Sequence, residues 1–132
     1  MARYVIDAPT LLHLVTEQVP VSAGHQLVAP NAVRSQALDL LFDQVRAGRL
    51  TDAVAMELHD RMTQLRIRLL GDRVSRRVAW QLAREHGFDS ATDAEFLAVT
   101  RLQADAYVTV DDAARTRADG IVPLGTVDQL TA

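Results

Sequence analysis

The sequence predicts an α/β fold, a three-layer α/β/α sandwich around a parallel sheet of short strands. Short apolar segments recur along the chain and are separated by longer stretches with helical periodicity. We expect these segments to be strands at residues 3–6, 67–70, 106–110 and 121–124. Strands that alternate with helices pair in parallel through crossover connections, so helices are expected to cover both faces of the sheet.

The composition is that of one globular domain. The chain has 132 residues, of which 48% are apolar and 23% charged, so residues 1–132 are expected to form a single domain. No apolar segment approaches the ~20 residues that span a bilayer, and no secretion signal opens the sequence. We therefore expect a cytoplasmic protein without membrane contact. Because cysteine is absent, a disulfide framework and a thiolate metal site are excluded.

The first helices follow from apolar residues that recur three and four positions apart. One helix carries the stripe Leu11 to Val15 and is expected to end before Pro20. The segment at residues 21–25 is expected to be a loop. Pro30 is then placed in the first turn of a long amphipathic helix, which Gly48 ends.

The later helices begin at residues that favour helix starts. Thr51 is expected to cap the third helix, and the turn Gly71-Asp72 precedes the fourth, which closes at His86-Gly87. A capping box that begins at Thr92 is expected to open the fifth helix. A short sixth helix is expected from about Asp112 to Ala118.

Three aspartates stand where a short apolar segment ends or a helix begins. Asp7 and Asp111 each follow an expected strand, and Asp93 opens the apolar-periodic segment Ala94 to Leu102. In an open parallel sheet, the carboxyl ends of the strands and the following helices converge on one crevice. Three carboxylates that meet there repel one another unless a divalent cation holds them together. The pattern therefore predicts a metal-dependent phosphodiesterase.

The cationic side chains are all arginine, and the net charge is −3. Without lysine, a GxxxxGK[ST] phosphate-binding loop and Schiff-base catalysis are excluded. Six arginines lie between Arg66 and Arg84. They could guide RNA phosphates, because guanidinium groups bind phosphate bidentately, although a solvated helix face accounts for them as well. Trp80 and Phe96 lie on helical stripes and are expected in the core.

In these motifs the chain resembles a PIN domain, in particular the small single-domain toxins of VapBC toxin–antitoxin pairs. The resemblance covers roughly residues 3–125. It is carried by the opening Tyr4-Val5-Ile6-Asp7-Ala8, by the helix start Ser90 to Ala98, and by the segment Tyr107 to Asp112. The order and spacing of these motifs match the family more specifically than any one of them does.

The resemblance implies an Mg²⁺- or Mn²⁺-dependent endoribonuclease that hydrolyses RNA phosphodiester bonds, the toxin of a type II toxin–antitoxin system. By matching position, Asp7, Asp93 and Asp111 would be the catalytic and metal-binding residues, with Gln36 and Asp112 as further candidate ligands. Such a cation prefers oxygen ligands, keeps several waters and lowers the pKa of one of them. The implied partners are an RNA substrate, a cognate antitoxin protein and a second copy of the chain in a homodimer.

Two positions depart from the family's pattern. Gln36 stands where the family usually has a glutamate, and its amide oxygen brings no negative charge; Asp39 or Asp43 could substitute. Pro9 stands where relatives carry a polar residue that supports the site. Thr10 is nearby but is expected to point in another direction. These departures favour, as an alternative, a catalytically impaired PIN-like domain that binds an antitoxin peptide or RNA. An unrelated α/β domain whose aspartates only cap helices is a third hypothesis.

Overall fold

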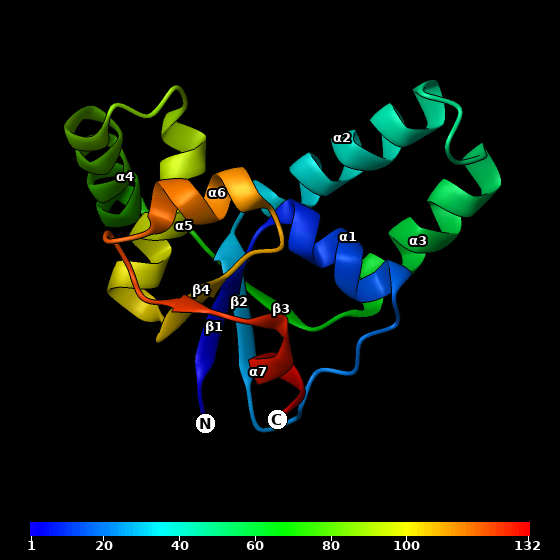
Figure 1. Ribbon diagram of the computed structural model, residues 1–132, viewed down its shortest axis with the longest axis horizontal. Coiled ribbons are helices and arrows are strands. Elements are labelled where there is room, and N and C mark those ends of the chain that lie inside the picture. Colours follow the sequence, from blue (N-terminus) through cyan, green and yellow to red (C-terminus); the bar gives the residue numbers. More distant parts are fainter.

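Five short strands form one fully parallel sheet in the computed structural model, which describes all 132 residues, Met1–Ala132 (Figure 1). The strands lie in the order β3-β2-β1-β4-β5. Their bounds are β1 (Arg3–Ile6), β2 (Gln26–Pro30), β3 (Ile67–Leu70), β4 (Ala106–Val108) and β5 (Leu124–Gly125). The chain thus builds outward from β1 to β3 and then returns to the other side of β1. The strand order reverses between β1 and β4, where open α/β sheets form their crevice.

Seven helices lie on the two sides of this sheet (Figure 1). On one side α4 packs along α5, and α5 contacts β1, β2 and β4; on the other side α1 packs against α2 and α3. Their bounds are α1 (Ala8–Thr16), α2 (Val33–Arg46), α3 (Asp52–Gln64), α4 (Arg73–His86), α5 (Ala91–Gln103), α6 (Asp112–Ala118) and α7 (Val127–Thr131). This arrangement confirms the predicted α/β class. None of these helices is long and apolar enough to cross a membrane.

The central strands are buried on both faces. Val5, Ile6, Val28 and Val108 are fully buried although neighbours along a strand point to opposite faces. In a parallel sheet that helices cover on both sides, side chains on both faces must be apolar. The strands are therefore continuous apolar runs rather than runs that alternate with polar residues. The buried apolar side chains form one cluster of 30 residues.

One strand is missing from the sequence prediction. A loop at residues 21–25 was expected to lead to a helix with Pro30 in its first turn, but Gln26–Pro30 is β2, hydrogen-bonded between β1 and β3. Pro30 is its last residue rather than the first turn of α2, which begins at Val33. The run Leu27-Val28-Ala29 is the signal for a strand buried on both faces, and it was too short to outweigh the helical pattern beside it.

The ends of the chain also differ from expectation. Of the strand expected at residues 121–124, only Leu124 pairs, and it is joined by Gly125 in β5. The strand expected at residues 106–110 leaves the sheet after Val108. The chain then closes on α7, which was not expected and which places the side chain of Leu130 in the core.

The helix starts are mostly those that the sequence predicts. Thr51 caps α3 and Asp72 caps α4, each accepting a hydrogen bond from a backbone N–H in the first turn. The cap of α5, however, is Ser90 rather than Thr92, because the Ser90 side chain accepts from the Asp93 N–H. Asp93 therefore lies in the first turn of α5, where its backbone N–H donates to the Ser90 hydroxyl.

Leu130 tests whether α7 belongs to the core. Its side chain is fully buried, at 0% exposure, so Leu130→Ala is expected to lower the free energy of unfolding by about 2–5 kcal/mol through lost contacts and a cavity. Leu102→Ala is the control, because Leu102 is 42% exposed and should cost about 1 kcal/mol or less. Urea denaturation of both variants measures the difference. Equal losses would mean that α7 does not pack as described.

Candidate active site

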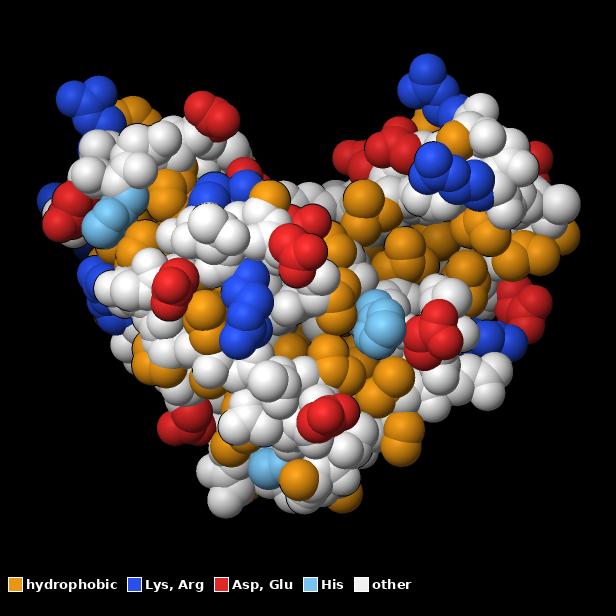
Figure 2. Space-filling view, viewed as in Figure 1, with side chains coloured by type: hydrophobic (Ala, Val, Ile, Leu, Met, Phe, Trp, Pro, Cys, Tyr) orange, Lys and Arg blue, Asp and Glu red, His pale blue; other side chains and the backbone are white.

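A cavity of about 280 Å³ opens where the strand order reverses, at the carboxyl ends of β1 and β4. Residues of α2 lie on one side of it, and residues of α5 and α6 lie on the other. Figure 2 shows the upper edge of the molecule hollowed between these two groups of helices. The cavity is lined by Asp7, Ala8, Pro9, Gln36, Asp39, Leu40, Asp93, Phe96, Leu97, Tyr107, Asp111, Ala114 and Arg117.

The tertiary structure brings the predicted site residues together. Asp7 follows β1, Asp93 lies in the first turn of α5, and Asp111 precedes α6, yet all three line the same cavity. Gln36 reaches it from α2. Asp112 does not line the cavity, and its side chain is exposed. The three aspartates thus share one cavity, and Asp7 and Asp111 are also helix caps, as the third hypothesis expects.

Asp7 is a buried carboxylate that the protein solvates completely. It is 5% exposed, and its two oxygens accept four hydrogen bonds. Oδ1 accepts from the Thr10 N–H at 3.1 Å and the Thr10 hydroxyl at 2.5 Å. Oδ2 accepts from the Tyr107 and Thr109 hydroxyls, each at 2.6 Å. A carboxylate offers about four lone-pair positions, so all the acceptor capacity of Asp7 is used.

Tyr107 is a neutral donor in this arrangement. Burial raises the pKa of the Tyr107 hydroxyl above its ordinary value, and the negative charge of Asp7 raises it further. The phenol therefore keeps its proton, which it donates to Asp7. Neither composition nor helical periodicity singled out Tyr107. Its position two residues before Thr109 in the strand expected at residues 106–110 is the available signal, because alternate residues of a strand share a face.

Thr10 supports the site, contrary to the sequence prediction. Its hydroxyl donates to Asp7 and accepts from the Val110 N–H at 3.1 Å, so it joins α1 to the segment after β4. The reason is that Asp7 is the N-cap of α1, and a capping side chain folds back over the residue three positions later. Thr10 thus supplies the polar support for Asp7 that the resemblance implied for a residue at position 9.

The other acids of the cavity are less engaged than Asp7. Asp111 accepts from the Ala114 N–H through one oxygen, which leaves its second oxygen free. Asp39, expected as one substitute for a missing glutamate, lines the cavity, whereas Asp43 does not. No carboxylate of the site is in an ion pair, because the sole ion pair of the chain joins Arg61 to Glu57. Arg117 is the one cationic side chain in the lining.

The oxygen atoms that line the cavity are the type of ligand that a hard divalent cation prefers. Every side-chain donor from the acids and from Gln36 is an oxygen, the ligand type that Mg²⁺ and Mn²⁺ take, and Mg²⁺ commonly keeps several waters. No three acidic or histidine side chains lie close enough together to hold an ion by themselves. A bound cation would therefore need water for several of its ligands, and the candidate protein ligands in the lining are Asp93, Asp111, Asp39 and Gln36. Asp7 would stand behind them, since its oxygens are already occupied.

Comparisons with known proteins identify the fold. No protein-family model matches the chain, and no curated protein matches it. Among solved structures, the crystal structure of PAE2754 from Pyrobaculum aerophilum is similar, with a TM-score of 0.75 and 21% sequence identity. The match covers 98% of this chain and 93% of that one. At this level of identity the likeness shows a shared α/β fold and nothing about activity.

Thr10→Val tests the support of Asp7. The variant removes a hydrogen bond to a buried charge and leaves the Val110 N–H without its acceptor, so the free energy of unfolding should fall by about 2–4 kcal/mol. Thr100→Val is the matched control, because Thr100 is equally buried but donates only to a carbonyl of its own helix. Its expected cost is about 1 kcal/mol or less. Chemical denaturation compares the two; similar costs would contradict the role given to Thr10.

Proposed function

We propose that this chain is an Mg²⁺- or Mn²⁺-dependent endoribonuclease that acts as the toxin of a type II toxin–antitoxin pair. The observation that supports the proposal most is the shared cavity of Asp7, Asp93 and Asp111, which Asp39 and Gln36 also line. Four carboxylates line one hollow with a single arginine, so their combined negative charge would attract a divalent cation. The positive charge of the cation would in turn favour their ionised forms. The position at the reversal of strand order is also where ligands bind in open α/β sheets.

The residues of the cavity divide into three roles under this proposal. Asp93, Asp111 and Asp39 offer oxygens that are free to hold a cation. Asp7 keeps β1, α1 and the end of β4 in register through its four hydrogen bonds. Arg117, the cationic side chain of the lining, would bind the phosphate that is cleaved. When bound, the cation supplies neutralisation of charge on that phosphate and a lowered pKa for a water molecule.

The toxin role further requires an antitoxin partner. Supporting it, α2 presents apolar side chains to solvent beside the residues that line the cavity. Leu38 and Phe42 are both exposed on this helix, next to Asp39. An amphipathic antitoxin segment would bury these side chains and reach the acidic cavity at the same time. The homodimer remains part of the proposal, tested by sedimentation of the purified chain.

Cleavage of a structured RNA tests the proposed activity. With Mg²⁺ or Mn²⁺ we expect cleavage that EDTA abolishes, and Asp93→Asn should lower the rate about 100-fold or more, since several kcal/mol of charge stabilisation depend on the bound cation. Asp128→Asn is the control, because Asp128 lies on α7 and does not line the cavity. Cleavage that ignores both EDTA and Asp93→Asn would refute the proposal.

Gln36→Glu tests the missing acid. A carboxylate at this position adds a negative charge to the cavity lining, so the variant should bind Mn²⁺ roughly tenfold more tightly, as measured by calorimetry. Gln44→Glu is the matched control, because it adds the same charge on the same helix outside the cavity. If both variants gain equally, or neither gains, Gln36 is not where the site lost its charge.

A catalytically impaired binding module is the second candidate. Two observations favour it: the acceptor positions of Asp7 are filled by protein donors, and Gln36 brings no charge. Such a protein would bind RNA or an antitoxin peptide without measurable affinity for Mg²⁺ or Mn²⁺. Calorimetry with the ions, beside an RNA-binding assay in EDTA, separates the two candidates.

A further inference from the structure

Trp80 is exposed on the outer face of α4. The sequence prediction placed it in the core, but its side chain is 64% exposed, while Ser75, Ala79 and Leu82 form the buried face of the helix. That expectation was wrong because α4 buries only a narrow face against α5. An exposed indole offers a flat surface on which a nucleic-acid base can stack, and it gains significance where cationic side chains lie beside it.

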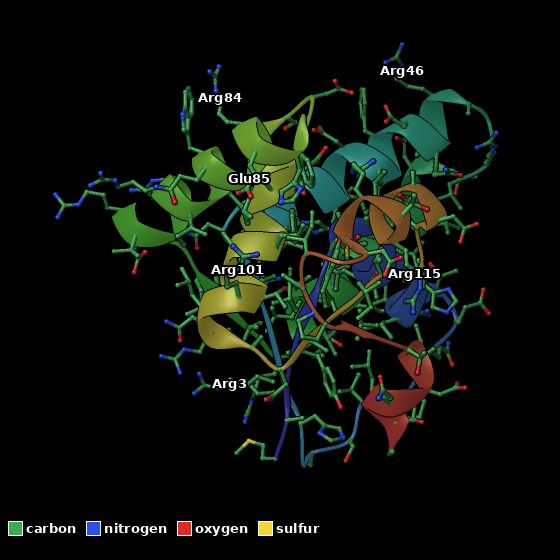
Figure 3. All side chains as sticks on the ribbon, turned by 60° about the vertical axis from the view of Figure 1, so that its left-hand side comes forward. Arg3, Arg46, Arg84, Glu85, Arg101 and Arg115 are labelled. Atoms are coloured by element: carbon green, nitrogen blue, oxygen red, sulfur yellow. The ribbon has the colours of Figure 1, made fainter.

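Four arginines share this face with Trp80. Arg73, Arg77 and Arg84 lie at the −7, −3 and +4 positions from Trp80, which places them along one line of a helix with 3.6 residues per turn, and Arg76 lies beside them. We call the set Arg73, Arg76, Arg77, Trp80 and Arg84 the α4 basic face. Figure 3 shows Arg84 extending from the helix into solvent.

The positive charge of the α4 basic face is not neutralised by ion pairs. All of its arginines are exposed, and the chain's sole ion pair lies on α3, between Arg61 and Glu57. The nearby acids are few. Asp72 accepts hydrogen bonds as the cap of α4, Glu85 is turned about 140° around the helix from Trp80, and Glu95 approaches from α5. In a chain with a net charge of −3, this face is a local basic patch.

A hollow of about 270 Å³ connects the α4 basic face to α5. It is lined by Arg76, Ala79 and Trp80 from α4 and by Ala91, Thr92 and Glu95 from α5. The same first turns of α5 supply Asp93, Phe96 and Leu97 to the acidic cavity. The two hollows are thus separated by the width of one helix start, about 10 Å.

We propose that the α4 basic face binds single-stranded RNA and leads it over the start of α5 into the acidic cavity. An unpaired base stacks on the indole of Trp80, and the arginines bind the phosphates on either side of it. A single strand is required, because the bases of a duplex are stacked on each other and cannot reach the indole. This inference rests on the proposed function in that it names the form of its RNA substrate.

Trp80 also supplies the readout, because it is the sole tryptophan of the chain. A 12-nucleotide single-stranded RNA, titrated in EDTA so that no cleavage occurs, is expected to quench its fluorescence. The logarithm of the affinity should fall with the logarithm of salt concentration with a slope of about −3, as four neutralised phosphates of a single strand require. The same sequence as a duplex should quench weakly, and inorganic polyphosphate, which carries charge without bases, should not quench.

The variants use a fluorescein-labelled RNA, followed by anisotropy. Trp80→Leu should weaken binding about 5- to 100-fold. Arg76→Gln with Arg77→Gln should lower the salt slope by about 1.4. The matched control is Arg46→Gln with Arg49→Gln, which removes the same charge at the end of α2 and should leave the slope unchanged. Figure 3 shows Arg46 at the end of α2, away from Arg84 on α4.

Several results would overturn the inference. Unchanged RNA affinity in Trp80→Leu, or equal quenching by polyphosphate, would exclude stacking on the indole. Self-association that Trp80→Leu abolishes without altering RNA affinity would assign the face to a second copy of the chain. Quenching by phosphatidylserine vesicles but not by RNA would assign it to a membrane surface.

The failure of this inference can be distinguished from the failure of the nuclease proposal. If RNA binds through Trp80 but is never cleaved with Mn²⁺, only the nuclease proposal fails. If Asp93-dependent cleavage occurs and Trp80→Leu binds RNA normally, only this inference fails.

Discussion

The buried carboxylate of Asp7 has to be solvated by the protein, because an ionised group taken out of water without partners is very costly. Its four donors come from α1, from β4 and from the segment that follows β4. The hydrogen bonds to this one side chain therefore hold β1 against β4 and against α1. The acids Asp39, Asp93 and Asp111 line the same cavity as Asp7.

This solvation is supplied by neutral groups. Tyr107 and the two threonines donate hydrogen bonds to Asp7, but no cationic side chain forms an ion pair with it. The negative charge of Asp7 is thus stabilised by hydrogen bonds and is not cancelled by an ion pair. The α4 basic face lies on the other side of the start of α5 and carries the opposite charge. One short helical segment separates the surface proposed to bind RNA phosphates from the cavity proposed to bind a metal ion.

The parts of the fold that the sequence predicts well are those with strong local signals. The helix α4 has both a capping Asp72 and a closing Gly87, and both ends were expected. The strand β2 has no such markers: its three apolar residues stand beside Pro30, which favours a helix start when considered alone. Similarly, α7 is five residues long and is held by Leu130 packing into the core, a contact that no local pattern reveals.

The sequence by itself determined the α/β class and the three aspartates, because strand ends and helix starts are written in local apolar patterns and caps. Only the tertiary structure decided what each residue does. Tyr107 and Thr109 complete the shell of Asp7 because the reversal of strand order places β1 beside β4, about 100 positions apart in the chain. Trp80 is exposed because α5 covers only one face of α4, and burial depends on neighbours that a helical period does not specify.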